Sequence, residues 1–104
     1  MYLTMNRFKV KIGREEAFEA VWTGRDSHLG EVKGFVAFNL LKGSEKDGYR
    51  LYASHTAWEN EEAFRDWTRS EAFRMAHRSA GDHGDMYLGP PELEIFESVQ
   101  SIGG

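Results

Sequence analysis

The sequence of 104 residues contains no cysteine, only two prolines and no long apolar run. Without cysteine, the chain can form no disulfide, thiolate metal site or iron–sulfur cluster and has no cysteine nucleophile. Its longest apolar runs are far shorter than the roughly 20 residues that a membrane-spanning helix needs, and the first residues have no signal-peptide pattern. We therefore expect a cytoplasmic protein that has no membrane partner.

Basic residues are in the minority, because 13 Lys and Arg stand against 17 Asp and Glu, which gives a formal net charge of -4. A basic surface that could neutralise a nucleic-acid backbone is not expected, so nucleic acid is a poor candidate partner. No linker or internal repeat divides the chain. With 40% hydrophobic and 13% aromatic residues, residues 1–104 can form one core and are expected to be a single domain.

Apolar spacing predicts a strand and then a helix near the start of the chain. Residues 3–11 alternate, with Asn6 and Phe8 on one face and charged residues on the other, which is typical of a strand with one buried face. Over residues 14–23, apolar residues recur at helical spacing behind an acidic first turn, and Gly24 follows as a stop.

Three further strands and a long helix complete the predicted order strand, helix, strand, strand, helix, strand. The strands are expected over residues 34–41, 49–58 and 94–99, with a turn over residues 42–48. The second helix is expected to begin after an Asn60 cap and to run for about 20 residues to a stop at Gly81.

This order is that of the ferredoxin-like split βαβ, an α+β fold in which two helices cover one face of a four-stranded antiparallel sheet. Residues 49–58 are apolar on parts of both faces, so the second face of the sheet also needs a cover. A second sheet from a second copy of the chain is the natural cover, and we expect a homodimer.

Four histidines are the strongest candidate metal ligands in a chain without cysteine. His77 falls on the same stripe of the predicted long helix as Trp67. His55 lies in the middle of a strand, where a structural role is expected, and His28 and His83 lie in polar loops where solvated side chains are expected. No pair of histidines has the spacing of a zinc hydrolase, and no phosphate loop or serine nucleophile motif is present.

Asn6 is informative because an amide in the middle of a half-buried strand is costly unless its donors and acceptor are used. It either bonds to a neighbouring loop or faces the helices as a functional group. His77 and Trp67 have the same ambiguity, since a single helical histidine is usually solvated and a single tryptophan is usually core. Together, an imidazole, an amide and an indole could line one cleft that suits a flat apolar ligand.

Heme matches this set of groups, because its iron takes a neutral imidazole, bound oxygen needs a hydrogen-bond donor and the macrocycle needs apolar walls. On a straight helix, however, Trp67 and His77 would lie about 15 Å apart along the axis. Both can contact one porphyrin only if the indole leans inward or the helix bends. Ser70 could bend the helix by hydrogen-bonding back to a carbonyl group.

Four segments carry a resemblance to a known family. They are Asn6-Arg7-Phe8, Gly34-Phe35, residues 58–64, and residues 67–77 with the pattern W-x-x-S-x-x-F-x-x-x-H. On these motifs the chain resembles the IsdG-type heme-degrading monooxygenases, within the antibiotic-biosynthesis-monooxygenase (ABM) superfamily. The combination of Asn6, Trp67 and His77 separates this group from the rest of the superfamily. The resemblance spans most of the chain and implies a dimeric ferredoxin-like α+β barrel.

The resemblance also implies a role for individual residues on heme, which would be both cofactor and substrate. His77 would be the axial iron ligand, and Asn6 would hydrogen-bond to oxygen bound on the opposite side. Trp67 would press on the macrocycle and favour a ruffled heme. Phe64 and Phe73 would add apolar contacts.

The reaction implied by the resemblance is opening of the porphyrin ring by O2 and electrons, with release of iron that would serve iron acquisition. An external electron donor, either a reductase or a small reductant, would supply the electrons. Arg25 is a candidate partner for a heme propionate, and a solvated loop charge is the alternative for it. Residues 24–33 and 81–91 depart from the family pattern in length and composition.

Two other functions stay open on the sequence. A cofactor-independent monooxygenase of the same superfamily would use Asn6 and Trp67 to position oxygen and an activated aromatic substrate without iron. A heme carrier would ligate iron through His77 and turn nothing over. Addition of hemin should give a Soret band with the heme-degrading enzyme and with the carrier, but none with the cofactor-independent monooxygenase. Only the band of the carrier should survive reductant and air.

Overall fold

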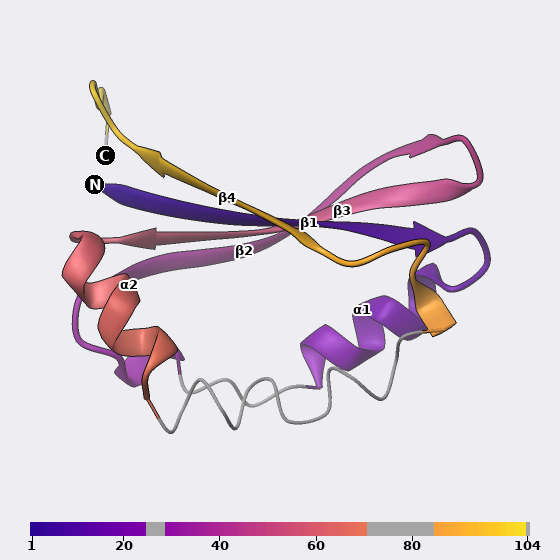
Figure 1. Ribbon diagram of the computed structural model, residues 1–104, viewed down its shortest axis with the longest axis horizontal. Helices are drawn as coiled ribbons and strands as arrows, with labels where there is room; N and C mark the ends of the chain where they lie inside the picture. Colours follow the sequence, from indigo (N-terminus) through magenta and orange to yellow (C-terminus); the bar gives the residue numbers. More distant parts are fainter. Residues whose placement is uncertain (25–28, 71–84, 104) are drawn as a thin grey trace.

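The computed structural model of the protein describes residues 1–24, 29–70 and 85–103. Its elements are, in chain order, β1 (Tyr2–Lys11), α1 (Glu15–Thr23), η1 (Leu29–Glu31), β2 (Phe35–Lys46), β3 (Tyr49–Trp58), α2 (Glu61–Thr68) and β4 (Glu92–Glu97). The strands form one antiparallel sheet in the order β2-β3-β1-β4. The predicted ferredoxin-like α+β architecture is confirmed, with α1 and α2 on the same face of the sheet (Figure 1).

The face of β1 that was expected to be buried lies toward the helices. Thr4, Phe8 and Val10 are buried on this side, whereas Lys9 is exposed. The register pairs Phe8 with Tyr52 of β3, and residues that pair across two strands share a face of the sheet. The register therefore assigns the residues of all four strands either to the face that the helices cover or to the open face.

Two hydrophobic clusters fill the helix-covered side, one beneath each helix. The buried members of the α1 cluster are Phe8, Val10, Phe18, Tyr52 and Met86, and those of the α2 cluster are Tyr2, Trp58, Ala63 and Trp67. The helices lie at opposite ends of the sheet (Figure 1), so the clusters are separated along the strands. Neither hydrophobic cluster therefore fills the middle of this face, between the two helices.

The second helix begins as predicted but is shorter than predicted. The Asn60 side chain caps it by accepting a hydrogen bond of 2.9 Å from the Ala63 N–H. The helix ends at Thr68, and residues 71–84, including the expected stop at Gly81, lie outside the described residues. None of the helices in the described part of the chain is long and apolar enough to cross a membrane.

Ser70 makes the hydrogen bond that was expected of it. Its hydroxyl donates to the Trp67 carbonyl oxygen at 2.6 Å, and its backbone N–H donates to the same oxygen at 3.0 Å. Both bonds span three residues rather than four, so they tighten the chain and end the α-helical pattern here. The prediction of one uninterrupted helix of about 20 residues is therefore wrong at this point, because the α-helix ends at Thr68.

Two strand boundaries also differ from the prediction. β2 continues to Lys46 rather than ending at Leu41, so the expected turn over residues 42–48 is reduced to two residues. The pairing of β2 with β3 shifts register between Lys42 and Glu45, which allows the polar end of β2 to stay in the sheet. At this irregularity, the Arg50 guanidinium donates a hydrogen bond of 3.1 Å to the Gly43 carbonyl oxygen. β4 covers Glu92–Glu97 rather than residues 94–99, because pairing with β1 begins directly after Pro91.

Gly34 allows the start of β2 to lie against α2. Its φ of +86° is in the left-handed region, and a Cβ atom at this position would lie 2.5 Å from the Ala63 Cβ. The Gly34 carbonyl oxygen also accepts a hydrogen bond of 2.8 Å from the Glu59 N–H just before α2. No larger residue fits this approach, which accounts for the glycine before Phe35.

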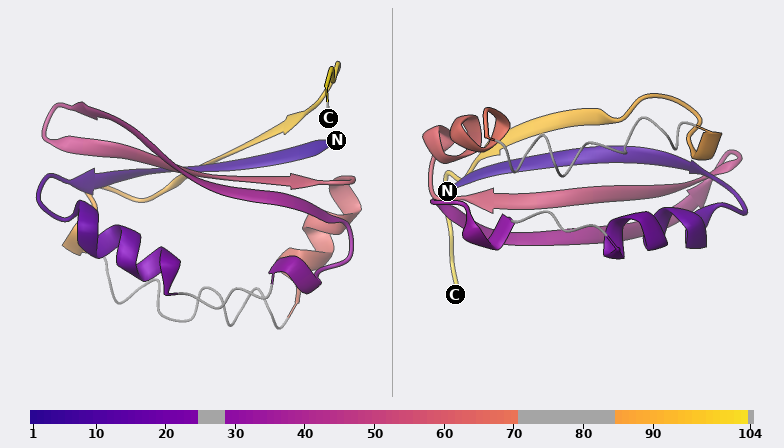
Figure 2. Two further views of the ribbon diagram at one scale, coloured as in Figure 1. Left: turned by 180° about the vertical axis from the view of Figure 1, so that it is seen from behind. Right: turned by 90° about the horizontal axis from the view of Figure 1, so that it is seen from below.

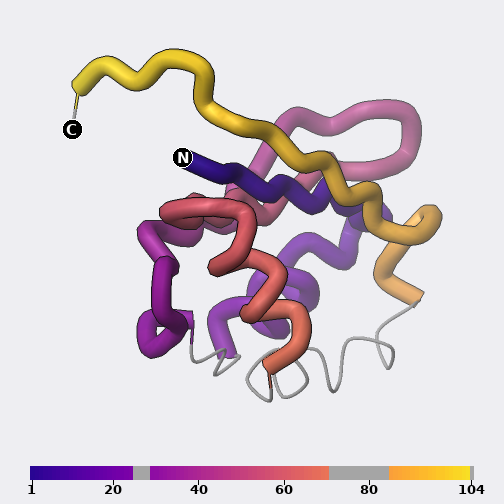
Figure 3. Tube along the Cα trace, turned by 60° about the vertical axis from the view of Figure 1, so that its left-hand side comes forward, coloured from indigo at the N-terminus to yellow at the C-terminus, as the bar shows by residue number. Residues whose placement is uncertain are grey.

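The open face of the sheet has no helix over it (Figure 2). Leu41 is 43% exposed and Phe96 is 47% exposed, and the register places both on this face. At the edge strand, the Ser98 N–H donates to the Met1 carbonyl oxygen at 2.9 Å, so the chain runs beside the N-terminus before it turns away (Figure 3). The second cover that the sequence predicts is not supplied by the described residues of a single chain.

Candidate functional site

Four small polar side chains occupy the middle of the helix-covered face, between the two clusters. We call them the polar band: Thr4, Asn6, Ser54 and Thr56. The register pairs Thr4 with Thr56 and Asn6 with Ser54, so the band consists of two neighbouring pairs on the central strands. Thr4, Ser54 and Thr56 are buried and Asn6 is half-buried.

Large apolar residues surround the polar band on all four sides in the plane of the sheet. Along the strands, the pair Tyr2 and Trp58 precedes the band and the pair Phe8 and Tyr52 follows it. Across the strands, its neighbours are Phe38 and Leu40 of β2 and Leu93 and Ile95 of β4. The sheet therefore presents a polar centre with an apolar border to whatever lies between the helices.

Asn6 lies where the sequence predicts, on the helix-covered face of β1. Its amide side chain has no hydrogen bond to any residue in the described ranges. The interpretation in which a neighbouring loop satisfies the amide therefore has no support from residues 1–24, 29–70 and 85–103. The two donors and the acceptor of the amide are available on the side that faces the helices.

Trp67 and Phe64 lie on the same side of the sheet as Asn6, but mainly as core residues. Trp67 is 7% exposed, and its ring centroid lies 6.2 Å from that of Trp58. Phe64 is half-buried, with ring centroids 5.8 Å from Tyr2 and 5.9 Å from Trp58. The structural role that the sequence allowed for Trp67 is therefore observed.

A buried hydrogen bond connects the α2 cluster to the polar band. The Trp58 indole Nε1–H donates to the Thr4 hydroxyl at 3.2 Å. Trp67 contacts Trp58 from one side, and Thr4 is two residues before Asn6 on the same face of β1. Trp67 is thus connected to Asn6 through the Trp58 indole and then along strand β1 from Thr4.

A second aromatic wall of the site was not predicted from the sequence. Trp22, near the end of α1, stacks on Phe38 of β2 with ring centroids 5.8 Å apart and an interplanar angle of 15°. Phe38 pairs with Thr56, so this stack borders the polar band from the β2 side. The spacing of Trp22 predicts only that it faces the core, because its partner comes from a strand that is distant in sequence.

Three of the predicted site residues cannot be placed. His77, Phe73 and Arg25 lie outside the described residues, as do His28 and His83. His55 lies on the open face of the sheet, since it pairs with Met5 and Asn39, and is therefore on the opposite side from Asn6. Within the described ranges, no group of three or more histidine or carboxylate side chains is arranged to hold a metal ion.

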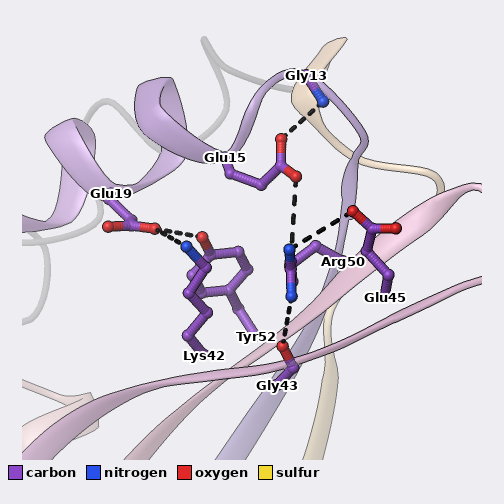
Figure 4. A network of polar contacts seen from close by, with 8 residues as sticks. All are labelled: Gly13, Glu15, Glu19, Lys42, Gly43, Glu45, Arg50 and Tyr52. Carbon is purple, nitrogen blue, oxygen red and sulfur yellow. Dashed lines mark hydrogen bonds and ion pairs between the residues drawn. The ribbon is translucent and has the colours of Figure 1, made fainter.

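A polar network at the far end of the sheet holds α1 in place (Figure 4). The Tyr52 hydroxyl donates to the Glu19 carboxylate, and the Lys42 ammonium lies 3.4 Å from the same carboxylate. Burial and the neighbouring Glu19 raise the pKa of Tyr52, while the hydrogen bond from Tyr52 lowers the pKa of Glu19. Backbone N–H groups, including that of Gly13 at 2.6 Å, lower the pKa of Glu15.

The open face carries a separate cavity of about 170 Å³ near the β2–β3 hairpin. It is lined by Arg7, Lys9, Lys46, Tyr49, Leu51, Pro90 and Glu92. The Lys9 ammonium lies 5.5 Å from the centroid of the Tyr49 ring, and Arg7 forms an ion pair with Glu94. This cavity lies on the opposite side of the sheet from Asn6 and is not part of the candidate site.

Comparison with known proteins supports the family suggested by the motifs. Residues 1–79 match the antibiotic biosynthesis monooxygenase family. A heme-degrading monooxygenase of Listeria welshimeri is 34% identical over 89 residues, which cover 79% of this chain and 74% of that protein. A staphylobilin-producing heme oxygenase of Staphylococcus epidermidis is 30% identical over 104 residues, which cover 98% of this chain and 97% of that protein.

The fold is also similar to that of a solved heme degrader. MhuD from Mycobacterium tuberculosis, in a structure with two hemes bound in its active site, has a TM-score of 0.74 and 26% sequence identity to this chain. The alignment covers 99% of this chain and 100% of MhuD. From its sequence motifs, its sheet order and these matches, the chain belongs to the antibiotic biosynthesis monooxygenase family.

Proposed function

We propose that this protein is a heme-degrading monooxygenase that binds heme between the helices and the polar band. The observation that carries the proposal is the Asn6 amide, which has no partner within the described residues and lies at the centre of an apolar border. The heme-degrading monooxygenase of Listeria welshimeri and the heme oxygenase of Staphylococcus epidermidis, which this chain resembles, support the same activity. Heme would be the substrate, and its iron would supply the activation of O2.

The described residues fit the sheet side of a bound heme. The porphyrin is flat and apolar, and the α2 cluster and the Trp22–Phe38 stack offer apolar surface on either side of the polar band. Asn6 would donate a hydrogen bond on the sheet side of the heme and so orient the small molecule that reacts there. Trp67 and Phe64 would contact the macrocycle from the α2 side.

His77 would hold the iron through a neutral imidazole nitrogen. The separation of about 15 Å between Trp67 and His77 assumes a straight helix. Because the α-helical pattern ends at Thr68 and Ser70 bonds back to Trp67, that separation does not apply. Phe73 would add apolar contact, and Arg25 would pair with a propionate.

The proposed reaction consumes O2 and electrons from an external donor, opens the porphyrin ring and releases iron. The Asn6 amide would act on the sheet side without changing its own protonation state, since an amide does not titrate near neutral pH. Burial of the site between two aromatic walls would exclude water from the reacting face. Iron acquisition in the cytoplasm is the physiological role that we propose for this reaction.

We further propose that the protein acts as a homodimer in which the open faces of two sheets come together. Leu41 and Phe96 on this face are both more than two-fifths exposed in the single chain. Apolar side chains on an uncovered sheet face favour association with a partner surface of the same kind. The helix-covered side of each sheet, with its polar band, would stay on the outside of such a dimer.

An absorbance titration with hemin, followed by ascorbate in air with catalase present, tests the proposed function. A Soret band that forms and then decays would support ring opening by the protein itself, because catalase removes free peroxide. A band that persists would show a heme carrier, and no band would favour the cofactor-independent monooxygenase. Either of these results would overturn the proposal.

The variant His77→Ala tests the axial ligand, and His55→Ala is its matched control on the opposite face of the sheet. We expect hemin affinity to fall at least about tenfold in His77→Ala, with loss of ring opening, and to be unchanged in His55→Ala. Full turnover by His77→Ala would remove His77 from the site.

A further inference from the structure

Ser54 is a polar residue at the centre of the helix-covered face of the sheet. It is 8% exposed and lies directly opposite Asn6 on the neighbouring central strand. Its hydroxyl has no hydrogen bond to another residue in the described part of the chain. The oxygen of this hydroxyl is not among the buried side-chain atoms that lack a partner in the described ranges, so the hydroxyl is accessible to a ligand on the helix-covered side.

The neighbouring residues of the polar band show why Ser54 differs from a structural hydroxyl. The Thr4 hydroxyl is engaged by the Trp58 indole at 3.2 Å and therefore serves the α2 cluster. Ser54 instead lies between Asn6 on β1 and Leu40 on β2, and offers its hydroxyl to the space above the sheet. A valine or isoleucine at this position would continue the apolar border and would suit the strand better.

The pairing of Ser54 with Asn6 brings two hydrogen-bond donors close together. Directly paired residues on antiparallel strands have Cβ atoms about 4.5–5.5 Å apart and point to the same side. Donors at this separation can both reach a single small molecule at hydrogen-bond distances of about 2.9 Å. Asn6 can donate through its NH2 group and Ser54 through its hydroxyl.

We propose that Ser54 is a second hydrogen-bond donor of the heme site and acts with Asn6 on the small molecule that binds to the iron from the sheet side. The inference rests on the proposed function. Two donors fix the direction of a bound diatomic molecule or anion, whereas one donor fixes only one contact. Ser54 therefore determines orientation at the reacting face and contributes little to binding of the macrocycle.

Fluoride binding to the hemin-loaded ferric protein tests this inference without turnover. Fluoride is a small anion whose binding to ferric heme is strengthened by nearby donors, because hydrogen bonds to charged acceptors are stronger than neutral ones. The dissociation constants of hemin and of fluoride would be measured for the native protein, Ser54→Ala and Asn6→Ala. Ser44→Ala removes the same hydroxyl at an exposed position of β2 and is the matched control.

We expect Ser54→Ala to weaken fluoride binding about tenfold while hemin binding stays within about twofold of the native protein. Ser54→Cys keeps the approximate size of the side chain but has a weak donor, and we expect a similar loss. This second variant tests the donor even if the alanine variant does not fold. Ser44→Ala should match the native protein in both constants.

The outcomes separate this inference from the proposed function. Native fluoride affinity in both Ser54 variants, with weakened binding in Asn6→Ala, would overturn the role of Ser54 and leave the heme site intact. Loss of hemin binding in Ser54→Ala and Ser54→Cys would show a structural role and would also overturn it. A native protein that binds no hemin would overturn the proposed function and this inference together.

Discussion

At the scale of single residues, the side chains of the polar band divide into two kinds. Thr4 has a partner within the protein, because it accepts a hydrogen bond from Trp58. Asn6, Ser54 and Thr56 have none within the described residues. The first kind holds the core together, and the second kind is available to a ligand, so substitutions of the two kinds should have different effects.

Asn6→Ala should leave the protein folded and able to bind hemin but slow its degradation about 100-fold. This is the usual effect of removing one donor that acts on a reacting group. Loss of the hemin Soret band over time, with ascorbate as donor, measures the rate. Asn39→Ala is the matched control, since Asn39 is exposed on the open face and pairs with His55. Equal rates for Asn6→Ala and the native protein would contradict a role for the amide.

Thr4→Val should lower the free energy of unfolding by about 1–2 kcal/mol, because it leaves the buried Trp58 indole N–H without its acceptor. Valine has nearly the same shape as threonine, so little packing is lost. Urea denaturation followed by tryptophan fluorescence measures the change. A variant as stable as the native protein would show that the 3.2 Å contact contributes nothing measurable.

At the scale of elements, local sequence patterns predicted the strands on either side of the site well. The strand β3 begins and ends at the predicted residues, and α1 begins one residue later than predicted. Asn6 could be selected as a site residue because an amide stands out in an alternating strand. Ser54 could not, because serine on a strand is unremarkable until the register shows that it lies opposite Asn6.

The elements that were mispredicted are those in which specific hydrogen bonds or pairings override what the local composition suggests. Residues 42–48 are polar and glycine-containing, which is typical of a turn, yet pairing of Glu45 with Arg50 extends β2 to Lys46. Helical spacing continues in the sequence beyond Thr68, but the two bonds from Ser70 to the Trp67 carbonyl end the helix. The Trp22–Phe38 stack joins α1 to β2 and has no signature within either element.

The attachment of α1 to the sheet should depend on pH through Tyr52 and Glu19. The pKa of Glu19 is lowered from its ordinary value of 4.5 by the hydrogen bond from Tyr52, so this stabilisation is present above about pH 4.5 and is lost as the pH falls through the folded-state pKa. The pKa of Tyr52 is raised from 10.0, so stability is also lost as the pH rises above about 10.

Tyr52→Phe should therefore reduce the loss of stability at low pH and also the loss at high pH. The variant removes the hydroxyl that hydrogen-bonds to Glu19 and also removes the group that titrates at high pH. Thermal unfolding midpoints measured across pH would show a smaller loss below pH 4.5 and above pH 10 than in the native protein. Parallel profiles for the two proteins would show that this pair does not couple to folding.

At the scale of the whole molecule, the open face of the sheet should determine the oligomeric state. We expect Phe96→Glu to shift the protein from dimer to monomer, because it buries a charge against an apolar partner surface. Size-exclusion chromatography with light scattering gives the mass of each species. Ile12→Glu is the control, since Ile12 is exposed in the turn after β1. A native protein that is monomeric would contradict the dimer itself.

The division of the core into two clusters has a consequence for how the molecule opens. The clusters share no buried member among the described residues and are joined by the central strands β1 and β3. Each end can therefore loosen at a lower free-energy cost than global unfolding, so the backbone amides of α2 should exchange with solvent before those of the central strands. A protein built in this way can admit a rigid planar molecule and release a bent, cleaved one while its sheet stays folded.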